Sequence, residues 1–525
     1  MKQTSYDYVI VGAGSAGCVV ANRLSADPSR SVLLLEAGKS DRHPYIRIPA
    51  AFSKMFKTSR DWNYATEPEP TLADRELYVP RGKVIGGSSS INAMMYIRGN
   101  PIDFDEWAEA GCVGWSYSEV LPYFKKAEHN ERLNDEYHGQ GGPLNVADHP
   151  TPNPLTDSFV QACDAVGIKP TDDFNGANQT GSGYFQVNQR DGRRWSAADA
   201  YLHPAKTRKN LTVVSNAKAH RINFTNETAE SVDFTVRNRR HSVSATTEIV
   251  LCAGALGSPQ LLMLSGIGPA DELDKLGIEP IANLPVGVGL QDHPAVPIIY
   301  DCTRPISMDD VEHPKHLLRY LTQRKGKLRS NLSEAGAFLT TRPGASAPDL
   351  QFHFGPLHFA DHGFTRYDGN AFSFGPTLID VASRGFVKLR SLDASIPLSI
   401  NGNYLDQRSD IETLITGVRL GREIAAEKAF DTVRGIEVLP GSRIESDDEL
   451  EDFIRRTAEM IYHPTSTCQM GTGEGSVVNP LLQVNGVDNL RVVDASIMPK
   501  IVRGNTNAAT IMIAEKASDM MLTGL

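Results

Sequence analysis

A glycine-rich turn near the start of the chain has the residue types and spacing that bind the pyrophosphate of a nucleotide. It reads Gly12-Ala13-Gly14-Ser15-Ala16-Gly17 and lies between an apolar run and a helical run. In such a turn the first glycine allows the tight bend, the second lets pyrophosphate approach the backbone, and the third lets the helix pack on the strand. A second apolar run ends at Glu36, whose carboxylate is placed to accept a hydrogen bond from a ribose hydroxyl. The chain is therefore predicted to bind an ADP-containing cofactor.

A second glycine cluster, residues 82–92, reads GKVIGGSSSIN. Its small side chains and free backbone N–H groups suit an anion or an isoalloxazine ring packed close to the chain. A glycine-rich turn that binds nothing is the alternative for this segment taken alone.

The apolar patterns around these motifs predict an α/β fold with a second domain. Residues 297–450 carry strand patterns without a nucleotide signature, whereas strand and helix patterns alternate on either side. The expected strands are 211–214, 248–255, 350–354 and 489–495, and the expected helices are 258–264, 411–426 and 507–522. We therefore expect a discontinuous cofactor-binding domain closed by the C-terminus (1–160, 195–296 and 452–525) and a substrate-binding domain (161–194 and 297–451).

Two further segments stand out by composition. Residues 44–80 are rich in Pro, Asp and aromatic side chains without a helix or strand period, which predicts a long excursion over the surface. Residues 315–329 are the most basic stretch and interleave leucines at helical spacing. We interpret that stretch as a solvated amphipathic helix, and a membrane or polyanion patch is the alternative.

The composition is that of an ordinary globular protein. The 525 residues carry 53 basic and 63 acidic side chains, and the net charge of −10 argues against nucleic acid as a main partner. Six scattered cysteines without metal-type spacing predict reduced thiols, no metal site and a cytoplasmic location. No apolar run reaches the ~18 residues of a membrane span, and the early first strand leaves no room for a signal peptide. The oligomeric state is not predicted.

Four ordered blocks resemble the glucose-methanol-choline (GMC) oxidoreductases, flavoproteins that oxidise alcohols. The match covers nearly the whole chain, and its blocks are residues 82–92, 254–268, 493–499 and 505–507. The resemblance, nearest to bacterial alcohol and choline dehydrogenases, implies FAD as the cofactor. It also implies a Rossmann-like FAD-binding domain and a substrate domain with a mostly antiparallel sheet flanked by helices.

The resemblance further implies a catalytic pair. The family's catalytic histidine matches His463 in the block Tyr462-His463-Pro464, and the second position, His or Asn in relatives, falls on Asn507. The chemistry explains the pair, because neutral imidazole accepts a hydroxyl proton near pH 7 while hydride leaves the alcohol carbon. An amide orients the hydroxyl without competing for that proton.

The cofactor-binding residues predicted from the turn and from the resemblance surround both glycine clusters and the C-terminal blocks. They are Gly12, Gly14, Ser15, Ala16, Gly17, Glu36, Ala37, Gly82, Val84, Gly87, Ser88, Asn92, Ala219, Ala253, Gly254, Asp494, Ala495, Asn505 and Thr506. Some choline-oxidising relatives attach the flavin through a histidine just before the Asn of the second cluster, where this chain has Ile91. Isoleucine has no nucleophile, so FAD is expected to bind noncovalently, with Asn92 near its reactive edge.

The substrate contacts are less constrained. Glu334 resembles the position at which choline oxidases carry a carboxylate facing the substrate's ammonium, and a structural, hydrogen-bonded Glu is the alternative. Four aromatic side chains are candidates for an apolar pocket: Tyr64, Phe354, Phe359 and Tyr462. Of these, Tyr462 is also predicted to contact the substrate. Core packing is the alternative explanation for such aromatic residues.

We predict a FAD-dependent oxidoreductase acting on CH–OH donors, which converts a primary or otherwise activated alcohol to its aldehyde. The hydroxyl proton goes to His463 and the hydride to flavin N5, and a quinone-like acceptor or dioxygen then reoxidises the flavin. Choline oxidation is one specific activity that this reading includes. A hydroxynitrile lyase of the same fold with redox-silent FAD is the alternative from another class.

Overall fold

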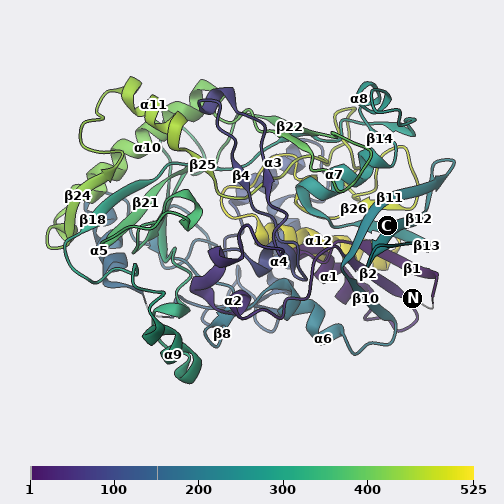
Figure 1. The fold of residues 1–525 in the computed structure, drawn as a ribbon, viewed down its shortest axis with the longest axis horizontal. Coiled ribbons are helices and arrows are strands. Elements are labelled where there is room, and N and C mark those ends of the chain that lie inside the picture. The colour runs from purple at the N-terminus through teal and green to yellow at the C-terminus, as the bar shows by residue number, and fades with distance from the viewer. Residues whose placement is uncertain (1–2, 151) are drawn as a thin grey trace.

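The structure, a computed structural model, describes residues 3–150 and 152–525. Two β-sheets lie side by side, the first at the right of Figure 1 and the second at the left. Both chain termini lie beside the first sheet, and the C-terminal helix α12 (Asn507–Thr523) crosses the middle of the view. The C-terminus therefore returns to the part of the molecule in which the chain begins.

The first sheet is largely parallel. In sheet order its strands are β10 (Leu211–Ser215), β2 (Val32–Glu36), β1 (Ser5–Val11), β13 (Arg239–Leu251), β12 (Thr228–Val236) and β11 (Ala217–Thr225), and β26 (Leu490–Val492) also pairs with β13. Strands β10, β2, β1, β13 and β26 run parallel, and β11 and β12 extend the sheet as antiparallel neighbours. Helices cover the central strands, which explains why these read as continuous apolar runs.

Three helices connected with this sheet position the site. Helix α1 (Ser15–Leu24) follows β1, and α7 (Gly254–Leu264) follows β13. Helix α12 packs between α1 and α4 (Tyr117–Ala127). Because each helix directly follows a strand or a buried loop, its N-terminus is held at the carboxyl edge of the sheet, where open α/β sheets bind ligands.

Within the described residues, the strand pairs of the second sheet are antiparallel. Its strands are β24 (Arg434–Leu439), β18 (Ile298–Cys302), β21 (Ala371–Leu378), β20 (Leu350–Gly355), β19 (Ala335–Leu339) and β7 (Gly181–Tyr184), with β17 (Pro294–Ala295) and β25 (Glu459–Met460) at one end. Helices α5 (Pro154–Ala165), α10 (Arg408–Ala426) and α11 (Asp447–Thr457) pack on it. Their shared core is rich in phenylalanine, including the buried Phe159, Phe352 and Phe372.

The remaining elements are short. The strand pairs and the small three-stranded sheet are β3 (Tyr64–Ala65) with β4 (Tyr78–Val79), β5 (Glu128–Asn130) with β6 (Leu144–Val146), β8 (Gln189–Arg190) with β9 (Arg193–Arg194), β14 (Ile267–Gly268) with β15 (Ala282–Asn283), and β16 (Val288–Leu290) with β22 (Gly385–Lys388) and β23 (Ser399–Asn401). The short helices are α2 (Pro44–Arg47), α3 (Pro101–Glu109), α6 (His203–Ala205) and α8 (Ala270–Asp274).

The predicted fold class is confirmed: a Rossmann-like parallel sheet with helices stands beside a mostly antiparallel sheet flanked by helices. The strands and helices expected from periodicity are present as β10, β13, β20, β26, α7, α10 and α12. The residue boundaries of the two domains stay a prediction. Helix α5 packs on the second sheet, although the predicted boundary placed residues 154–160 with the first.

Segment 44–80 differs from the predicted surface excursion. It contains α2, the 3₁₀ turn Pro49–Met55 and the β3–β4 pair, and its Ile46, Phe52 and Phe56 are buried in a small core. Proline at the first turn starts both helical pieces, and the apolar residues that follow supply a face to bury. The segment is thus a wall of the protein's interior rather than a loop on its outside.

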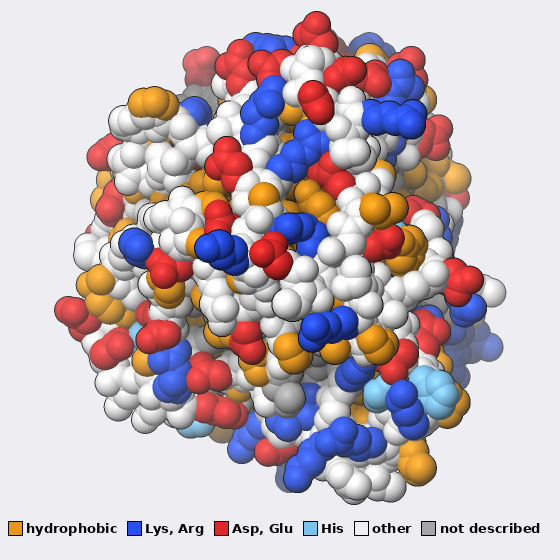
Figure 2. Space-filling view, turned by 90° about the vertical axis from the view of Figure 1, so that its left-hand side faces the viewer, with side chains coloured by type: hydrophobic (Ala, Val, Ile, Leu, Met, Phe, Trp, Pro, Cys, Tyr) orange, Lys and Arg blue, Asp and Glu red, His pale blue; other side chains and the backbone are white. Residues whose placement is uncertain are grey.

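The predicted amphipathic helix is α9 (Pro314–Gln323), but its apolar side faces outward. Tyr320 is its buried side chain, whereas Leu318 is 65% and Leu321 58% exposed. Figure 2, seen from the left of Figure 1, shows Lys and Arg side chains gathered at its lower end, the end of the molecule where α9 lies. Within residues 3–150 and 152–525, no helix combines the length and the apolar character that crossing a membrane demands. The six cysteines are free and buried, and the cytoplasmic location stays a prediction.

Candidate active site

A cavity of about 610 Å³ runs from the edge of the first sheet to the second sheet and collects most of the predicted residues. It begins at the carboxyl ends of β1 and β2, passes the first residues of α1, α7 and α12, and ends against β20 and β21. The predicted residues that line it are Gly12, Gly14, Ser15, Ala16, Glu36, Ala37, Gly82, Gly87, Ser88, Asn92, Ala219, Ala253, Gly254, Tyr462, His463, Asp494, Ala495, Asn505, Thr506 and Asn507.

The glycines of the first turn are there for different reasons. A Cβ at Gly17 would lie 1.8 Å from the carbonyl oxygen of Gly12, so Gly17 lets α1 pack against the turn. Gly12 has a φ of +102°, and a Cβ there would lie 2.5 Å from the Cys252 oxygen. Gly14 has an ordinary φ of −79°, and the nearest protein atoms beyond its chain neighbours would lie 3.9 Å from a Cβ. Protein packing does not demand glycine at position 14, whereas a pyrophosphate held against the backbone does.

Glu36 ends β2 and lines the nucleotide end of the cavity. Its Oε2 accepts a hydrogen bond from the Ala13 N–H (2.8 Å), and its Oε1 accepts one from the Gly38 N–H (2.7 Å). Burial raises the pKa of Glu36 to about 7, and the two backbone donors oppose that rise. Each carboxylate oxygen has a second acceptor site, so Glu36 fixes the turn and still offers an acceptor to a ribose hydroxyl.

The second glycine cluster lies directly against the first. A Cβ at Gly87 would approach the Gly14 Cα to 2.6 Å, so side chains larger than hydrogen would separate the two segments. Residues Gly87–Ser90 form a 3₁₀ turn, and the residues on either side of its end, Ser88, Ile91 and Asn92, face the cavity.

Helix N-termini converge on this region. The Asp494 Oδ2 accepts hydrogen bonds from the Gly254 N–H (2.8 Å) and the Ser258 hydroxyl (2.5 Å), which fixes the start of α7. The Ser15 hydroxyl donates to Asn507 Oδ1 (2.7 Å) and joins the start of α1 to the start of α12. The positive ends of the helix dipoles at these starts favour the negative charge of a phosphate or a reduced flavin ring.

His463 lines the cavity where it meets the second sheet. Its Nε2 lies 3.3 Å from Asn505 Nδ2, and its Nδ1 lies 3.0 Å from Nδ1 of His293. Its backbone N–H donates to Asp292 Oδ1 (2.7 Å), which also accepts from the His293 N–H (2.8 Å). One carboxylate therefore holds the backbones of both histidines.

The surroundings keep His463 uncharged. Burial lowers its pKa well below the usual value, and His293, His353 and Arg81 lower it further. Burial also lowers the pKa of His293 to about 3 and that of His353 to about 4. A neutral imidazole keeps one nitrogen lone pair, so this arrangement is able to take a proton from a hydroxyl placed beside His463 and Asn505.

Comparison with known proteins identifies the family. Family models described as GMC oxidoreductase match residues 6–295 and 381–514. The chain belongs to the GMC oxidoreductase family. It is 44% identical to an alcohol dehydrogenase [acceptor] of Pseudomonas putida (98% of this chain, 96% of the relative) and 44% identical to the mitochondrial choline dehydrogenase of Homo sapiens (99% and 90%).

Solved structures agree with this assignment to the GMC oxidoreductases. A pyridoxine 4-oxidase from Mesorbium loti superposes with a TM-score of 0.91 at 35% identity over 99% of each chain. A formate oxidase from Aspergillus oryzae, studied for the modification of its FAD, gives a TM-score of 0.93 at 27% identity over 99% of this chain and 98% of that one.

In this GMC oxidoreductase the side chain beside His463 is Asn505; the predicted Asn507 also lines the cavity, and its catalytic role stays a prediction. The Nδ2 of Asn505 faces His463 Nε2, whereas the Oδ1 of Asn507 accepts from Ser15. The two asparagines stand two residues apart in one motif, and α12 begins at Asn507, so their side chains have different partners. Sequence spacing does not show which of them reaches the histidine.

The prediction of Glu334 as a substrate contact is wrong. Its carboxylate is fully buried behind the cavity wall and accepts hydrogen bonds from the Asn153 N–H (2.7 Å), the Thr156 hydroxyl (2.7 Å) and the Ser330 hydroxyl (2.6 Å). Asn153 is the N-cap of α5, so Glu334 ties that helix to the edge of β19. Three donors satisfy the carboxylate, and the structural alternative accounts for it.

Two predicted cofactor contacts lie behind the cavity surface. Gly17 acts through the packing of α1, as its close approach to Gly12 shows. Val84 is fully buried in the small core with Phe52 and Ile91. Both residues support the cavity walls from behind without reaching the cavity.

Tyr462 is held in an uncommon backbone conformation just before His463. Its φ is +69°, and Arg81 Nη2 donates to its carbonyl oxygen (2.7 Å) while its hydroxyl lies 2.6 Å from His362 Nδ1. A non-glycine residue in the left-handed region stores strain unless its surroundings hold it. The two contacts fix the residue and thereby the direction in which His463 leaves the chain.

The cavity wall beyond His463 is mostly apolar. Residues that line it there are Phe52, Phe56, Leu332, Leu357 and Phe359. Of the predicted aromatic residues, Tyr64, Phe359 and Tyr462 line the cavity, and Phe354 stacks on Phe159 in the core of the second sheet instead. Sequence analysis missed Phe52 and Phe56; their spacing of four within segment 44–80 was the available signal.

Charged side chains on this wall pair with one another. Arg75 forms an ion pair with Glu459, whose Oε2 lies 3.3 Å from His362 Nε2. All three line the cavity and were missed from the sequence, because they lie on three segments that only the fold brings together.

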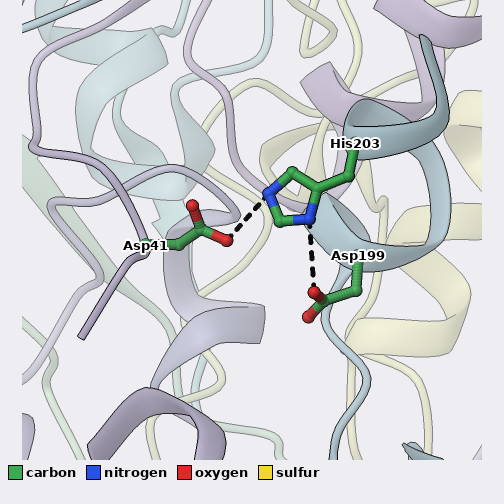
Figure 3. A group of neighbouring side chains, drawn as sticks. All are labelled: Asp41, Asp199 and His203. Carbon is green, nitrogen blue, oxygen red and sulfur yellow. Dashed lines mark ion pairs between the residues drawn. The ribbon is translucent and has the colours of Figure 1, made fainter. Parts of the chain in front are cut away.

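A cluster outside the cavity has metal-type residues but the geometry of an ion pair. Within the described residues, the group close enough to hold an ion consists of Asp41, Asp199 and His203. Figure 3 shows the His203 ring between the two carboxylates, with Nε2 2.9 Å from Asp41 and Nδ1 3.3 Å from Asp199. A metal-bound histidine gives one nitrogen to the ion, whereas here each nitrogen faces a carboxylate. The two carboxylates raise the pKa of His203 to about 9, so the ring is an imidazolium that joins the loop after β2 to α6.

Proposed function

We propose that the protein is a FAD-dependent oxidoreductase that converts a primary or otherwise activated alcohol to its aldehyde. The observation that carries the proposal is the uncharged imidazole of His463, whose Nε2 stands beside the Asn505 amide in a cavity that begins at a dinucleotide turn. The relatives named alcohol dehydrogenase and choline dehydrogenase support an alcohol as the electron donor.

The residues present fit FAD. The turn at residues 12–15 and the start of α1 would hold the diphosphate, Glu36 the ribose, and residues 87–92 with the starts of α7 and α12 the flavin half. A Cβ at Gly14 would meet protein atoms only at the ordinary contact distance of 3.9 Å, so protein packing leaves this backbone free to hold a ligand group. Bound FAD supplies an acceptor for hydride, which protein side chains lack.

The binding is proposed to be noncovalent. Ile91 stands in the cavity wall at the end of the second glycine cluster and is 3% exposed. Its side chain has no nucleophilic atom to form a bond with the flavin, and its packing against Val84 and Phe52 gives it a structural role.

The chain's own residues handle the hydroxyl proton. With the hydroxyl placed beside His463 Nε2 and Asn505 Nδ2, the imidazole accepts the proton and the amide donates a hydrogen bond to the alcohol oxygen. As negative charge grows on that oxygen, the bond from the amide becomes charge-assisted and stronger. The apolar wall of Phe52, Phe56 and Phe359 excludes water from the same space.

The substrate is proposed to be a neutral alcohol with an apolar tail. Aromatic faces suit an apolar tail and a quaternary ammonium alike, so the charged groups decide between them. Glu334 is buried elsewhere, Glu459 is paired with Arg75, and Arg81 is close enough to lower the pKa of His463. Asp361 is exposed, lines the cavity and has no ion pair within the described residues. A cationic substrate would therefore meet Arg81 and only this exposed carboxylate, which disfavours choline as the specific substrate.

Anaerobic flavin reduction tests both parts of the proposal. Choline and 3,3-dimethylbutan-1-ol have the same shape and differ in charge, so each would be mixed with the enzyme and the loss of flavin absorbance followed. We expect faster reduction, or a lower half-saturation, with the neutral alcohol, and reduction slower by about 10²- to 10⁴-fold in His463→Ala. A preference for choline would overturn the substrate class. Failure of a broad panel of aliphatic, aromatic and polyol alcohols to bleach the flavin would favour the redox-silent lyase.

The electron acceptor is proposed to be external, either a quinone-like carrier or dioxygen. Mixing the alcohol-reduced enzyme with each acceptor separates the two, because an oxidase returns its flavin colour rapidly with dioxygen and a dehydrogenase does so only with the carrier.

A further inference from the structure

His293 contacts the catalytic histidine from outside the cavity. Its side chain is fully buried at the start of β17, and its ring stands edge-on to the His463 ring at an interplanar angle of 87°. The two Nδ1 atoms are 3.0 Å apart. Two uncharged imidazole nitrogens at this distance share one hydrogen, so one carries it and the other accepts.

We propose that His293 fixes the tautomer of His463: it accepts a hydrogen bond from the His463 Nδ1–H and so keeps the proton-accepting lone pair on Nε2, at the cavity. His293 is thus a positioning residue that acts through His463. The effect on rate rests on the proposed function, because the tautomer limits a reaction only if His463 takes a proton there. The tautomer itself exists with or without a substrate.

The direction of the hydrogen bond follows from the group on the other side of the ring. Asn505 presents Nδ2, a donor, to His463 Nε2, and a donor requires an unprotonated nitrogen opposite it. A neutral imidazole with an unprotonated Nε2 carries its hydrogen on Nδ1, which then points at His293. Burial lowers the pKa of His293, and an uncharged His293 has a free Nδ1 to accept it.

The backbone fixes the spacing of the two rings. Asp292 Oδ1 accepts from the N–H groups of both His293 and His463, although these residues are 170 positions apart in sequence. The other charged or titratable groups that act on His463 are Arg81 and His353. Neither of them is hydrogen-bonded to the ring of His463 among the recorded contacts of the described residues, so His293 is the group at Nδ1.

The same contact acts during proton transfer. Once Nε2 has accepted the hydroxyl proton, His463 is an imidazolium, and its Nδ1–H bond to an uncharged acceptor becomes charge-assisted. Loss of such a bond lowers a rate by about 10- to 150-fold. His293 therefore fixes the neutral Nδ1–H tautomer of His463 and also stabilises the imidazolium that forms when Nε2 takes the proton.

Two substitutions of His293 distinguish the loss of its hydrogen-bond acceptor from the loss of its volume. Asparagine places its Oδ1 close to the position of the histidine Nδ1, so His293→Asn keeps an acceptor, and His293→Leu fills the space without one. We expect His293→Leu to lose about 10- to 150-fold in the limiting rate of anaerobic flavin reduction with little change in half-saturation, and His293→Asn to restore most of it. His149→Leu, at a buried histidine outside the cavity lining, is the control and leaves the rate unchanged. Equal losses in the Asn and Leu variants would overturn the proposal.

Nitrogen-15 NMR of the histidine-labelled holoenzyme reads the tautomer without any substrate, because protonated and unprotonated ring nitrogens have well-separated shifts. With His463 assigned by its disappearance in His463→Gln, we expect a protonated Nδ1 and a bare Nε2 in the wild type and in His293→Asn. A protonated Nε2 in the wild type would overturn the inference even if His293→Leu fails to fold. The predicted tautomer in an enzyme that no alcohol reduces would support the role of His293 and refute the proposed function.

Discussion

The two asparagines of the C-terminal motif provide the sharpest test of the site. Asn505→Ala removes the amide beside His463 Nε2, and Asn507→Ala removes the acceptor of the Ser15 hydroxyl. The substitutions are chemically identical and two residues apart, so each is the control for the other. We expect the first to slow chemistry and the second to loosen the cofactor site.

The magnitudes follow from the kinds of hydrogen bond. In the transition state the Asn505 amide donates to an alcohol oxygen that gains charge, and a bond to a charged group contributes about 1.5–3 kcal/mol. Its loss lowers the limiting rate of flavin reduction by about 10- to 150-fold. The Ser15–Asn507 bond joins two neutral groups at 2.7 Å. Its loss costs about 0.5–1.5 kcal/mol. We expect this loss to weaken the contact between the starts of α1 and α12, where the diphosphate would lie.

Anaerobic stopped-flow reduction and flavin content measure the two effects separately. We expect Asn505→Ala to purify with full flavin and a lower limiting rate, and Asn507→Ala to reduce at nearly the wild-type rate with weaker flavin retention. Full flavin and a larger rate loss in Asn507→Ala than in Asn505→Ala would refute the geometry and return the catalytic role to Asn507.

Four further outcomes are expected. His463→Ala should keep FAD and lose about 10² to 10⁴ in the rate of flavin reduction, as for a positioned base; near-normal reduction would exclude it as the base. Because Ile91 has no nucleophile, acid precipitation should leave the flavin in the supernatant, and yellow colour in the washed pellet would show a covalent bond. Glu36→Gln should weaken FAD binding, because the glutamine side chain has one acceptor oxygen and its NH₂ group would face the second of the two backbone N–H groups that Glu36 now accepts from; flavin content and a binding titration check this, with Glu36→Asp as the milder variant. The folded pKa of His203, about 9, exceeds its ordinary 6.5, so its stabilisation is full below pH 6.5 and is lost as pH rises through 9. The stability difference between wild type and His203→Gln, measured by urea unfolding, should shrink over that range, and a constant difference would contradict the ion pair.

Local motifs predicted the parts of the protein that local chemistry determines. The turn at residues 12–17 lies between its own strand and helix. The contacts that require glycine at positions 12 and 17 are made within this unit and with the neighbouring Cys252. The strands of the first sheet were recognisable because burial on both faces makes them continuously apolar. The same holds for α10 and α12, whose length and period identify them.

Tertiary placement decided what the sequence left open. Glu334 carries a plausible substrate charge in sequence, and only the fold brings Asn153 and Thr156 from α5 to satisfy it. Phe52 and Phe56 lie in a segment predicted as a surface excursion, and only the fold brings Leu332 and Leu357 to the other side of their core. A motif therefore identifies which polar side chains are candidates for the site, but the packing of the fold determines which hydrogen-bond partners each of them has.

The catalytic group depends on this packing more than the cofactor turn does. His463 receives its partners from two separate segments: Asp292 and His293 just before β17, and Asn505 just before α12. Asn505 lies two residues from Asn507, which Ser15 ties to the first turn of α1. The start of α12 is therefore shared between the turn that would hold the diphosphate and the amide that faces the base. A dinucleotide bound at that turn would lie against the segment from which Asn505 reaches His463, so we expect cofactor binding to steady the geometry of proton transfer through one helix start.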